Sequence, residues 1–171
     1  MLFRSLHPAD FRVPVSVAVG GDVSLEWLEP RLGETWTGGS MSLSWPDVVA
    51  GGRLRDGPRS VVIHEFAHQV DALDGDIDGV PPLAAARRRP WAEAIAACRE
   101  RFAEALEDGR ATPFDEYADE SPAEFFAVSS ECFFQDPHRL VRFDAALYDL
   151  LMEAWQQDPQ ARSGARGSRR R

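Results

Sequence analysis

The sequence reads VVIHEFAHQVDALDG over residues 61–75. Its centre, His64 to His68, matches the pattern H-E-x-x-H. On a helix these two histidines lie one turn apart on the same face, so both imidazoles can reach one metal ion. Glu65 then lies beside the open coordination position, where a carboxylate can act as a general base. The stretch therefore predicts a helix that binds Zn²⁺ and activates water.

The residues around this motif indicate where the helix begins and ends. Pro58 suits a first helical turn, and Gly75 suits the position after a helix C-terminus. Apolar side chains recur between them at helical spacing, at Val62, Phe66, Val70 and Leu73. We therefore expect one amphipathic helix between Pro58 and Gly75. Asp71, near its end, could accept from an imidazole N–H, anchor the next loop or be solvated.

The residues before the helix follow a strand pattern. Valines alternate with other residues over 13–19 until Gly20-Gly21, which predicts a strand, and Pro14 favours an edge position for it. Residues 41–45 alternate in the same way and predict a second strand. That strand could be an ordinary one or an exposed edge that pairs with an extended peptide. Between the two strands we expect a loop and a short helix.

The residues after the helix predict further helices over 90–107, 122–135 and 137–157. The middle one is apolar almost all round and should be buried. Few early strands and many later helices indicate the α+β class, with a small N-terminal β-sheet before a mainly helical part. The length predicts a single domain over 1–158, followed by a disordered, Arg-rich tail over 159–171.

The composition excludes several classes of protein. Of 171 residues, 44% are hydrophobic and 27% are charged, which is typical of a folded globular chain. The net charge is -9 and five arginines lie in the last ten residues, so the remainder is strongly acidic and nucleic acid is not an expected partner. Two cysteines make no disulfide framework. Because no membrane span or secretory signal is recognisable, we expect a cytoplasmic protein with no membrane partner. We also expect a monomer.

A zinc site needs a third protein ligand beyond the two histidines. Asp74 lies six residues after His68, where some H-E-x-x-H proteins place this ligand, but a continuous helix would carry it away from the metal. Glu124 and Glu131 are better candidates, since they share one face of the apolar helix. Glu124 could instead bond to the backbone of Ser121 in a capping box, and Glu131 could form a salt bridge or support a ligand. The spacing leaves both glutamates as candidates.

Three stretches of the chain resemble the zinc peptidases of the Mlc titration factor A family. They are residues 62–71 (VIHEFAHQVD), residues 117–131 (YADESPAEFFAVSSE), and residues 43–52, where LSW is followed by DVVAGG. The resemblance runs from about Gly33 to Gln157. Family members usually carry a longer helical segment before the first strand than this sequence does.

The resemblance implies a zincin-like fold of the gluzincin type and a particular site. In that family the two motif histidines and a downstream glutamate hold the zinc, which carries over to His64, His68 and Glu124. The motif glutamate, here Glu65, is the general base. A tyrosine seven residues before the third ligand, here Tyr117, faces the site. The metalloprotease domain of anthrax lethal factor has the same tyrosine-to-glutamate interval.

Two functions follow from the resemblance as alternatives. The first is a zinc metallopeptidase that hydrolyses a peptide or protein substrate. The family resemblance favours aminopeptidase over endopeptidase activity. In this peptidase, Tyr117 would donate to the oxyanion of the tetrahedral intermediate, unless it is only a packing residue. The second is a regulatory protein that sequesters a transcriptional repressor, with weak or no peptidase activity. The intact Glu65 favours catalysis, because a structural zinc site needs no base and is normally closed by four protein ligands.

Overall fold

The computed structural model describes residues 4–9, 11–20, 23–31, 33–35, 41–52 and 58–162. Its strands are β1 (Arg4–His7), β2 (Phe11–Gly20), β3 (Val23–Arg31), β4 (Gly33–Thr35) and β5 (Met41–Ser44). Its α-helices are α1 (Trp45–Gly51), α2 (Val61–Asp71), α3 (Ala85–Glu107), α4 (Pro122–Gln135), α5 (Pro137–Phe143) and α6 (Ala145–Trp155). Two 3-10 turns are η2 (Ala72–Asp74) and η3 (Glu116–Asp119). A small β part before a mainly helical part agrees with the expected α+β class.

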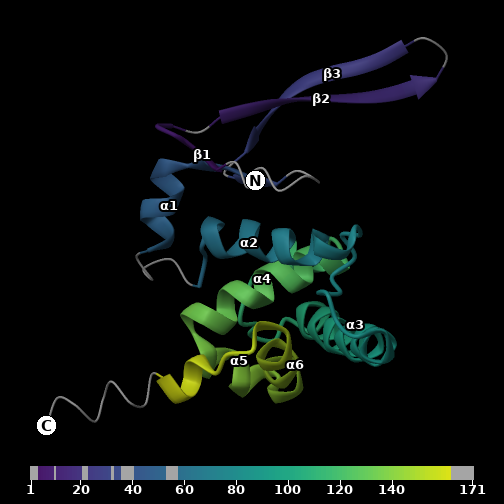
Figure 1. The fold of residues 1–171 in the computed structure, drawn as a ribbon, viewed down its shortest axis with the longest axis vertical. Helices are drawn as coiled ribbons and strands as arrows, with labels where there is room; N and C mark the ends of the chain where they lie inside the picture. The colour runs from purple at the N-terminus through teal and green to yellow at the C-terminus, as the bar shows by residue number, and fades with distance from the viewer. Residues whose placement is uncertain are drawn as a thin grey trace, which may run out of the picture.

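The described strands form a three-stranded sheet in the order β1-β5-β4 and a separate hairpin of β2 and β3. β1 runs parallel to β5, and β4 runs antiparallel to it. The hairpin extends away from the helices, as Figure 1 shows. Because β5 has a neighbour on each side and all four of its residues are buried, the interpretation of residues 41–45 as an exposed edge strand is wrong.

The prediction of a loop and a short helix between the two expected strands is also wrong. This segment forms β3 and β4, and β3 pairs with β2 so that Leu25 lies opposite Val17 and Trp27 opposite Val15. The segment does carry alternation of period 2, in Val23, Leu25 and Trp27. Pairing along the hairpin outweighs the turn signals of the nearby proline and glycine, since a strand gains its stability from its partner.

The two motif-bearing helices form where the sequence places them, with small differences at their ends. α2 starts at Val61 rather than at Pro58, because the hydroxyl of Ser60 caps it and accepts from the N–H of Ile63. It ends in η2 and in Gly75, whose φ of 105° only glycine adopts readily. α4 has the predicted bounds of 122–135.

The other helices differ more from the prediction. α3 begins at Ala85 and contains Pro90 near its start, because the alanines and arginines before the proline are strong helix formers. The expected last helix is two helices, α5 and α6, separated at Asp144. This residue is extended, and its side chain accepts from the N–H of Leu147, so it acts as an N-cap that the amphipathic pattern conceals.

The C-terminal end of the described chain is tied to α6. Residues 159–162 form one more helical turn. The hydroxyl of Tyr148 donates to Asp158 and accepts from the N–H of Gln160. Residues 163–171, which make up most of the expected tail, lie outside the described residues.

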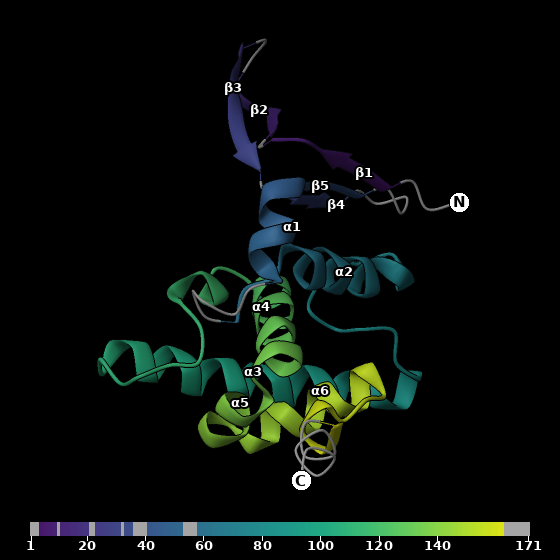
Figure 2. The same ribbon diagram turned by 90° about the vertical axis from the view of Figure 1, so that its left-hand side faces the viewer.

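α4 lies in the middle of the helical part, with α2 on one side and α3, α5 and α6 on the other (Figures 1 and 2). On the side away from α2, its Phe125, Phe126 and Phe133 are fully buried in an aromatic core that includes Phe102. Across the described residues, no helix combines the length and the apolar character that a membrane crossing requires. The buried core fixes α4 and so presents its opposite face to α2.

Candidate metal centre

The structure brings His64, His68 and Glu124 together between α2 and α4. One potential ligand atom from each lies within 4.8 Å of the others. The Nε2 atoms of the two imidazoles are 3.1 Å apart. The Glu124 carboxylate lies 3.1 Å from Nε2 of His64 and 3.4 Å from Nε2 of His68. Two nitrogen atoms and one carboxylate oxygen therefore face a common point.

The start of α4 explains why Glu124 reaches this point. Ser121 caps the helix by accepting from the N–H of Glu124 at 3.1 Å, and Pro122 occupies the first helical position. The cap fixes the backbone of Glu124 in the first turn, while its side chain extends towards the two histidines. The serine half of the capping box is thus present, and the glutamate side chain is directed to the site.

Glu131, the other candidate ligand, lies beside His64 on its far side. Its Oε1 is 2.9 Å from Nδ1 of His64, whereas Glu124 is near the Nε2 of the same ring. Its second oxygen accepts from the backbone N–H of Ser60, the residue that caps α2. Glu131 therefore supports a ring of the cluster and does not belong to the group of atoms that face one another.

The cluster fits a metal cation on its own chemistry. With Nδ1 of His64 held by a carboxylate, the lone pair of the neutral imidazole is at Nε2, facing the other two donor atoms. Buried Nδ1 of His68 makes no hydrogen bond to any described residue. Two imidazoles and one carboxylate are a donor set typical of a catalytic zinc site that keeps a fourth position open.

The electrostatics of the cluster also favour positive charge. Burial alone would lower the pKa of His64, but hydrogen bonds and charges from Glu124 and Glu131 outweigh it and raise the pKa to about 10. Burial alone would raise the pKa of Glu124, yet the hydrogen bonds and charges of His64 and His68 outweigh it and lower the pKa well below the usual range. The same negative charge that holds a proton here would stabilise a divalent cation.

Of the two residues expected to act on substrate, Glu65 is adjacent to a donor residue in the sequence and Tyr117 lies near one in space. Glu65 follows His64 on α2 and is only 7% exposed. Tyr117 lies on η3 and is 42% exposed, with its ring centroid 6.2 Å from that of His64. A half-exposed phenol at the edge of a buried cluster can meet a ligand that approaches from solvent.

Asp71 turns out to anchor the loop after α2. It is fully buried, and its Oδ2 accepts from the N–H of Gly79 at 2.9 Å. The carbonyl of Gly79 accepts from the indole N–H of Trp91 on α3 at 3.2 Å. Gly79 has a φ of 78° and lies against the carbonyl of Pro122 at the start of α4. This glycine contacts three helices, and only its residue type could have pointed to this role from the sequence.

Asp74, the less favoured third ligand, lies away from the cluster. It is in η2 and forms an ion pair with Arg88 of α3. Arg88 also lies 3.9 Å from Asp78, so Asp74 and Asp78 both hold the loop against α3. The helix and η2 carry Asp74 past the histidine face, as the continuous helical pattern predicts.

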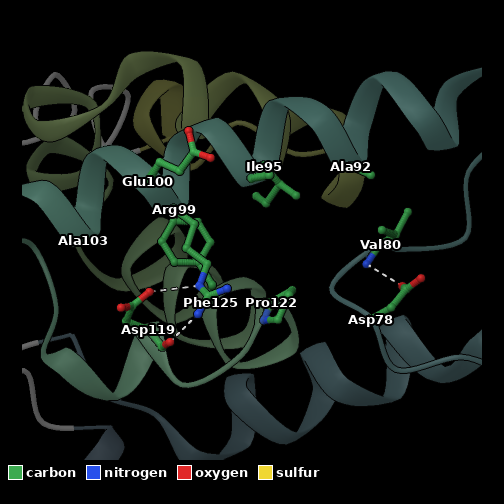
Figure 3. A pocket seen from close by; sticks show the side chains of 11 residues that line it. Asp78, Val80, Ala92, Ile95, Arg99, Glu100, Ala103, Asp119, Pro122 and Phe125 are labelled. Atoms are coloured by element: carbon green, nitrogen blue, oxygen red, sulfur yellow. Dashed lines mark hydrogen bonds and ion pairs between the residues drawn. The ribbon is translucent and has the colours of Figure 1, made fainter.

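A separate pocket of about 510 Å³ lies between α3, η3 and the start of α4 (Figure 3). Its apolar wall includes Ile95, Pro122 and Phe125. At one end Figure 3 shows Arg99 directed at Asp119, the last residue of η3, with 3.0 Å between Arg99 Nε and the carboxylate. Arg99 also donates to the carbonyl of Asp119. This arginine, which the sequence analysis did not single out, fixes the turn that carries Tyr117.

Comparison with known proteins gives consistent matches over most of the chain. Residues 5–156 match the family described as glucose-regulated metallo-peptidase M90. An uncharacterized protein of Synechocystis sp. is 33% identical over 159 residues, which cover 90% of this chain and 57% of the relative. Mlc titration factor A of Serratia proteamaculans and of Escherichia coli are each 32% identical over 133 residues, 76% of this chain and 50% and 49% of theirs. The chain thus spans about half the length of the curated relatives that it matches.

Proposed function

We propose, because the chain belongs to the glucose-regulated metallo-peptidase family M90, that it is a zinc-dependent peptidase. The observation that carries the proposal is the convergence of His64, His68 and Glu124, which we assign as the metal ligands. The relatives named Mlc titration factor A confirm the resemblance drawn from the sequence motifs. Three ligands of this kind leave one position for water or substrate, as in other catalytic zinc sites, and support a zincin-like arrangement.

Each residue around the metal would have a separate role in hydrolysis of the peptide bond. A bound Zn²⁺ would supply Lewis-acid polarisation of the scissile carbonyl and a lowered pKa for water. Glu65 would take a proton from the attacking water and deliver it to the leaving amine. The hydroxyl of Tyr117 would donate to the carbonyl oxygen as it becomes negative. Arg99 would keep Tyr117 in place through Asp119.

Metal analysis tests the ligand assignment. We expect the wild-type chain to retain stoichiometric Zn²⁺ after dialysis, and Glu124→Ala to lose it, because two imidazoles alone do not complete a zinc site. Glu120→Ala, an exposed position just before the helix, is the control and should keep its zinc. If Glu124→Ala also keeps its zinc while Glu131→Ala loses it, the third ligand is misassigned.

Tyr117→Phe should lower kcat by about 10²- to 10³-fold, because a donor to the developing oxyanion acts mainly in the transition state. KM should rise less, and zinc content and melting temperature should stay nearly unchanged, since the ring and its packing remain. The measurement is steady-state hydrolysis of a fluorogenic peptide.

The chain offers a matched control for this variant in Tyr148, its second tyrosine. The hydroxyl of Tyr148 bonds to Asp158 and Gln160. Tyr148→Phe should therefore reduce stability and leave turnover intact. Full turnover in Tyr117→Phe would reduce Tyr117 to a packing residue.

Among the types of peptidase, we propose an aminopeptidase, because the family resemblance favours it. Hydrolysis of short peptides with a free amino terminus, compared with the same peptides after acetylation, tests it. Faster cleavage of the free peptides is expected. Equal cleavage of both sets would indicate an endopeptidase.

A second candidate function is suggested by the name of the relatives, Mlc titration factor A, which implies that those proteins bind the repressor Mlc. We propose a repressor as a macromolecular partner of this chain as well. Binding of purified repressor to Glu65→Gln, measured by calorimetry, separates this function from peptidase activity. Binding that is unaffected by the substitution would show that partner capture does not depend on the catalytic base.

A further inference from the structure

We infer that Glu131 is a positioning residue for the metal centre, which fixes the ring and the tautomer of His64 and ties that ring to the first residue before α2. The inference rests on the proposed metal site and extends it to a residue that coordinates nothing. It assigns to Glu131 a role distinct from that of Glu124, although both lie on the same face of α4.

The geometry of the carboxylate carries the inference. Glu131 is 6% exposed, so its charge is withdrawn from water and must be compensated by bonds. One oxygen lies 2.9 Å from Nδ1 of His64. The other accepts from the backbone N–H of Ser60. Both partners belong to α2 or its cap, so a single side chain of α4 holds one side of α2 at two points.

The contact between Glu131 and Nδ1 of His64 determines which tautomer the imidazole adopts. A carboxylate facing Nδ1 requires a proton on that nitrogen, and the lone pair of the neutral ring then lies on Nε2. Nε2 is the atom that faces His68 and Glu124. Glu131 therefore selects the one neutral tautomer of His64 that can bind a metal at this point, and it also prevents rotation of the ring.

Replacement by glutamine separates this role from simple packing. A glutamine has one acceptor oxygen, whereas Ser60 and His64 present two N–H donors to residue 131. In Glu131→Gln one of these donors must face the amide NH₂ group. The variant keeps the volume of the side chain and loses the pair of accepted bonds.

The experiment measures Zn²⁺ affinity of the full chain by competition with a chromophoric chelator. We expect Glu131→Gln to bind Zn²⁺ about 10- to 100-fold more weakly than the wild type. The Co²⁺-loaded variant should also show a changed visible absorption spectrum, because its His64 ligand is no longer held in orientation. These readouts do not depend on peptidase activity.

Ser130→Ala is the matched control for damage to α4. Ser130 is buried next to Glu131 in sequence and accepts from the indole N–H of Trp155 at 3.0 Å, on the side away from the metal cluster. Its loss should lower the melting temperature without changing Zn²⁺ affinity. If Ser130→Ala weakens Zn²⁺ binding as much as Glu131→Gln does, Glu131 has only a structural role.

A measurement on the wild type keeps the inference testable even if Glu131→Gln fails to fold. Long-range ¹H–¹⁵N spectra of the zinc-loaded chain should show His64 protonated at Nδ1, and protonation at Nε2 would overturn the inference. Equal affinity in the wild type and Glu131→Gln would also overturn it while leaving the metal site intact. A wild-type chain that binds no Zn²⁺ would overturn the proposed function itself.

Discussion

Glu65→Gln should retain its Zn²⁺ and lose nearly all peptidase activity, with kcat reduced by about 10²- to 10⁴-fold. Glutamine keeps the size and hydrogen-bonding reach of the side chain but cannot take a proton from water. Glu65 is buried on α2 between the two histidines in sequence, so the substitution changes the chemistry with little change in packing. Hydrolysis of a fluorogenic peptide library, together with zinc analysis of the same samples, measures both parts of this expectation.

Glu116→Gln is the control for the loss of one negative charge near the site. Glu116 is exposed and precedes Tyr117 on η3. It should leave kcat close to that of the wild type. Equal hydrolysis rates in the wild type and Glu65→Gln would remove Glu65 from the role of general base, and loss of zinc in Glu65→Gln would show that it holds the metal centre together.

Gly79→Ala should destabilise the chain by about 2–5 kcal/mol, which combines the cost of a left-handed backbone for alanine with that of overpacking. A Cβ at this position would lie 2.4 Å from the carbonyl oxygen of Pro122, a backbone atom that cannot rotate away. The start of α4 or the loop must therefore shift. For a chain of this size the melting temperature should fall by about 5–20 °C, measured by calorimetry.

Gly109→Ala isolates the part of this loss that comes from backbone strain. Gly109 has a φ of 64°, close to the 78° of Gly79, but a Cβ there would meet nothing within 4 Å. The difference between the two variants measures the contact with Pro122. If both lose the same stability, the close approach of Gly79 to α4 contributes nothing.

The helices that carry the site were predictable because their signals are local. The motif on α2 lies in an apolar stripe of helical period, and Ser121-Pro122 marks the start of α4 at the right residue. The break at Asp144 was missed because the apolar stripe continues in phase across it, so the N-cap was the only local sign. β3 was missed because its strand character depends on pairing with β2.

The choice between Glu124 and Glu131 depends on how α2 and α4 pack, which neither helix encodes by itself. Seven residues correspond to about 10 Å along a helix, so the two carboxylates approach different parts of α2. One meets the Nε2 side of His64 and the other its Nδ1 side. The family resemblance pointed to Glu124 as the third ligand. The supporting contacts of Glu131, Gly79 and Arg99 became visible only with the three-dimensional arrangement.

The proposed ligands are divided between two helices, which bears on whether folding or metal binding comes first. His64 and His68 are close together in any helical form of α2, whereas Glu124 belongs to a segment that follows the whole of α3. An unfolded chain therefore offers a metal ion only a weak pair of imidazoles, and full affinity requires that α4 has already docked. An ion that binds only the folded form stabilises it. At a free concentration 1,000 times the dissociation constant, the ion would add about 4 kcal/mol to the free energy of unfolding. Zinc would then cross-link α2 and α4 in the folded protein, and its removal would weaken the contact between these two helices.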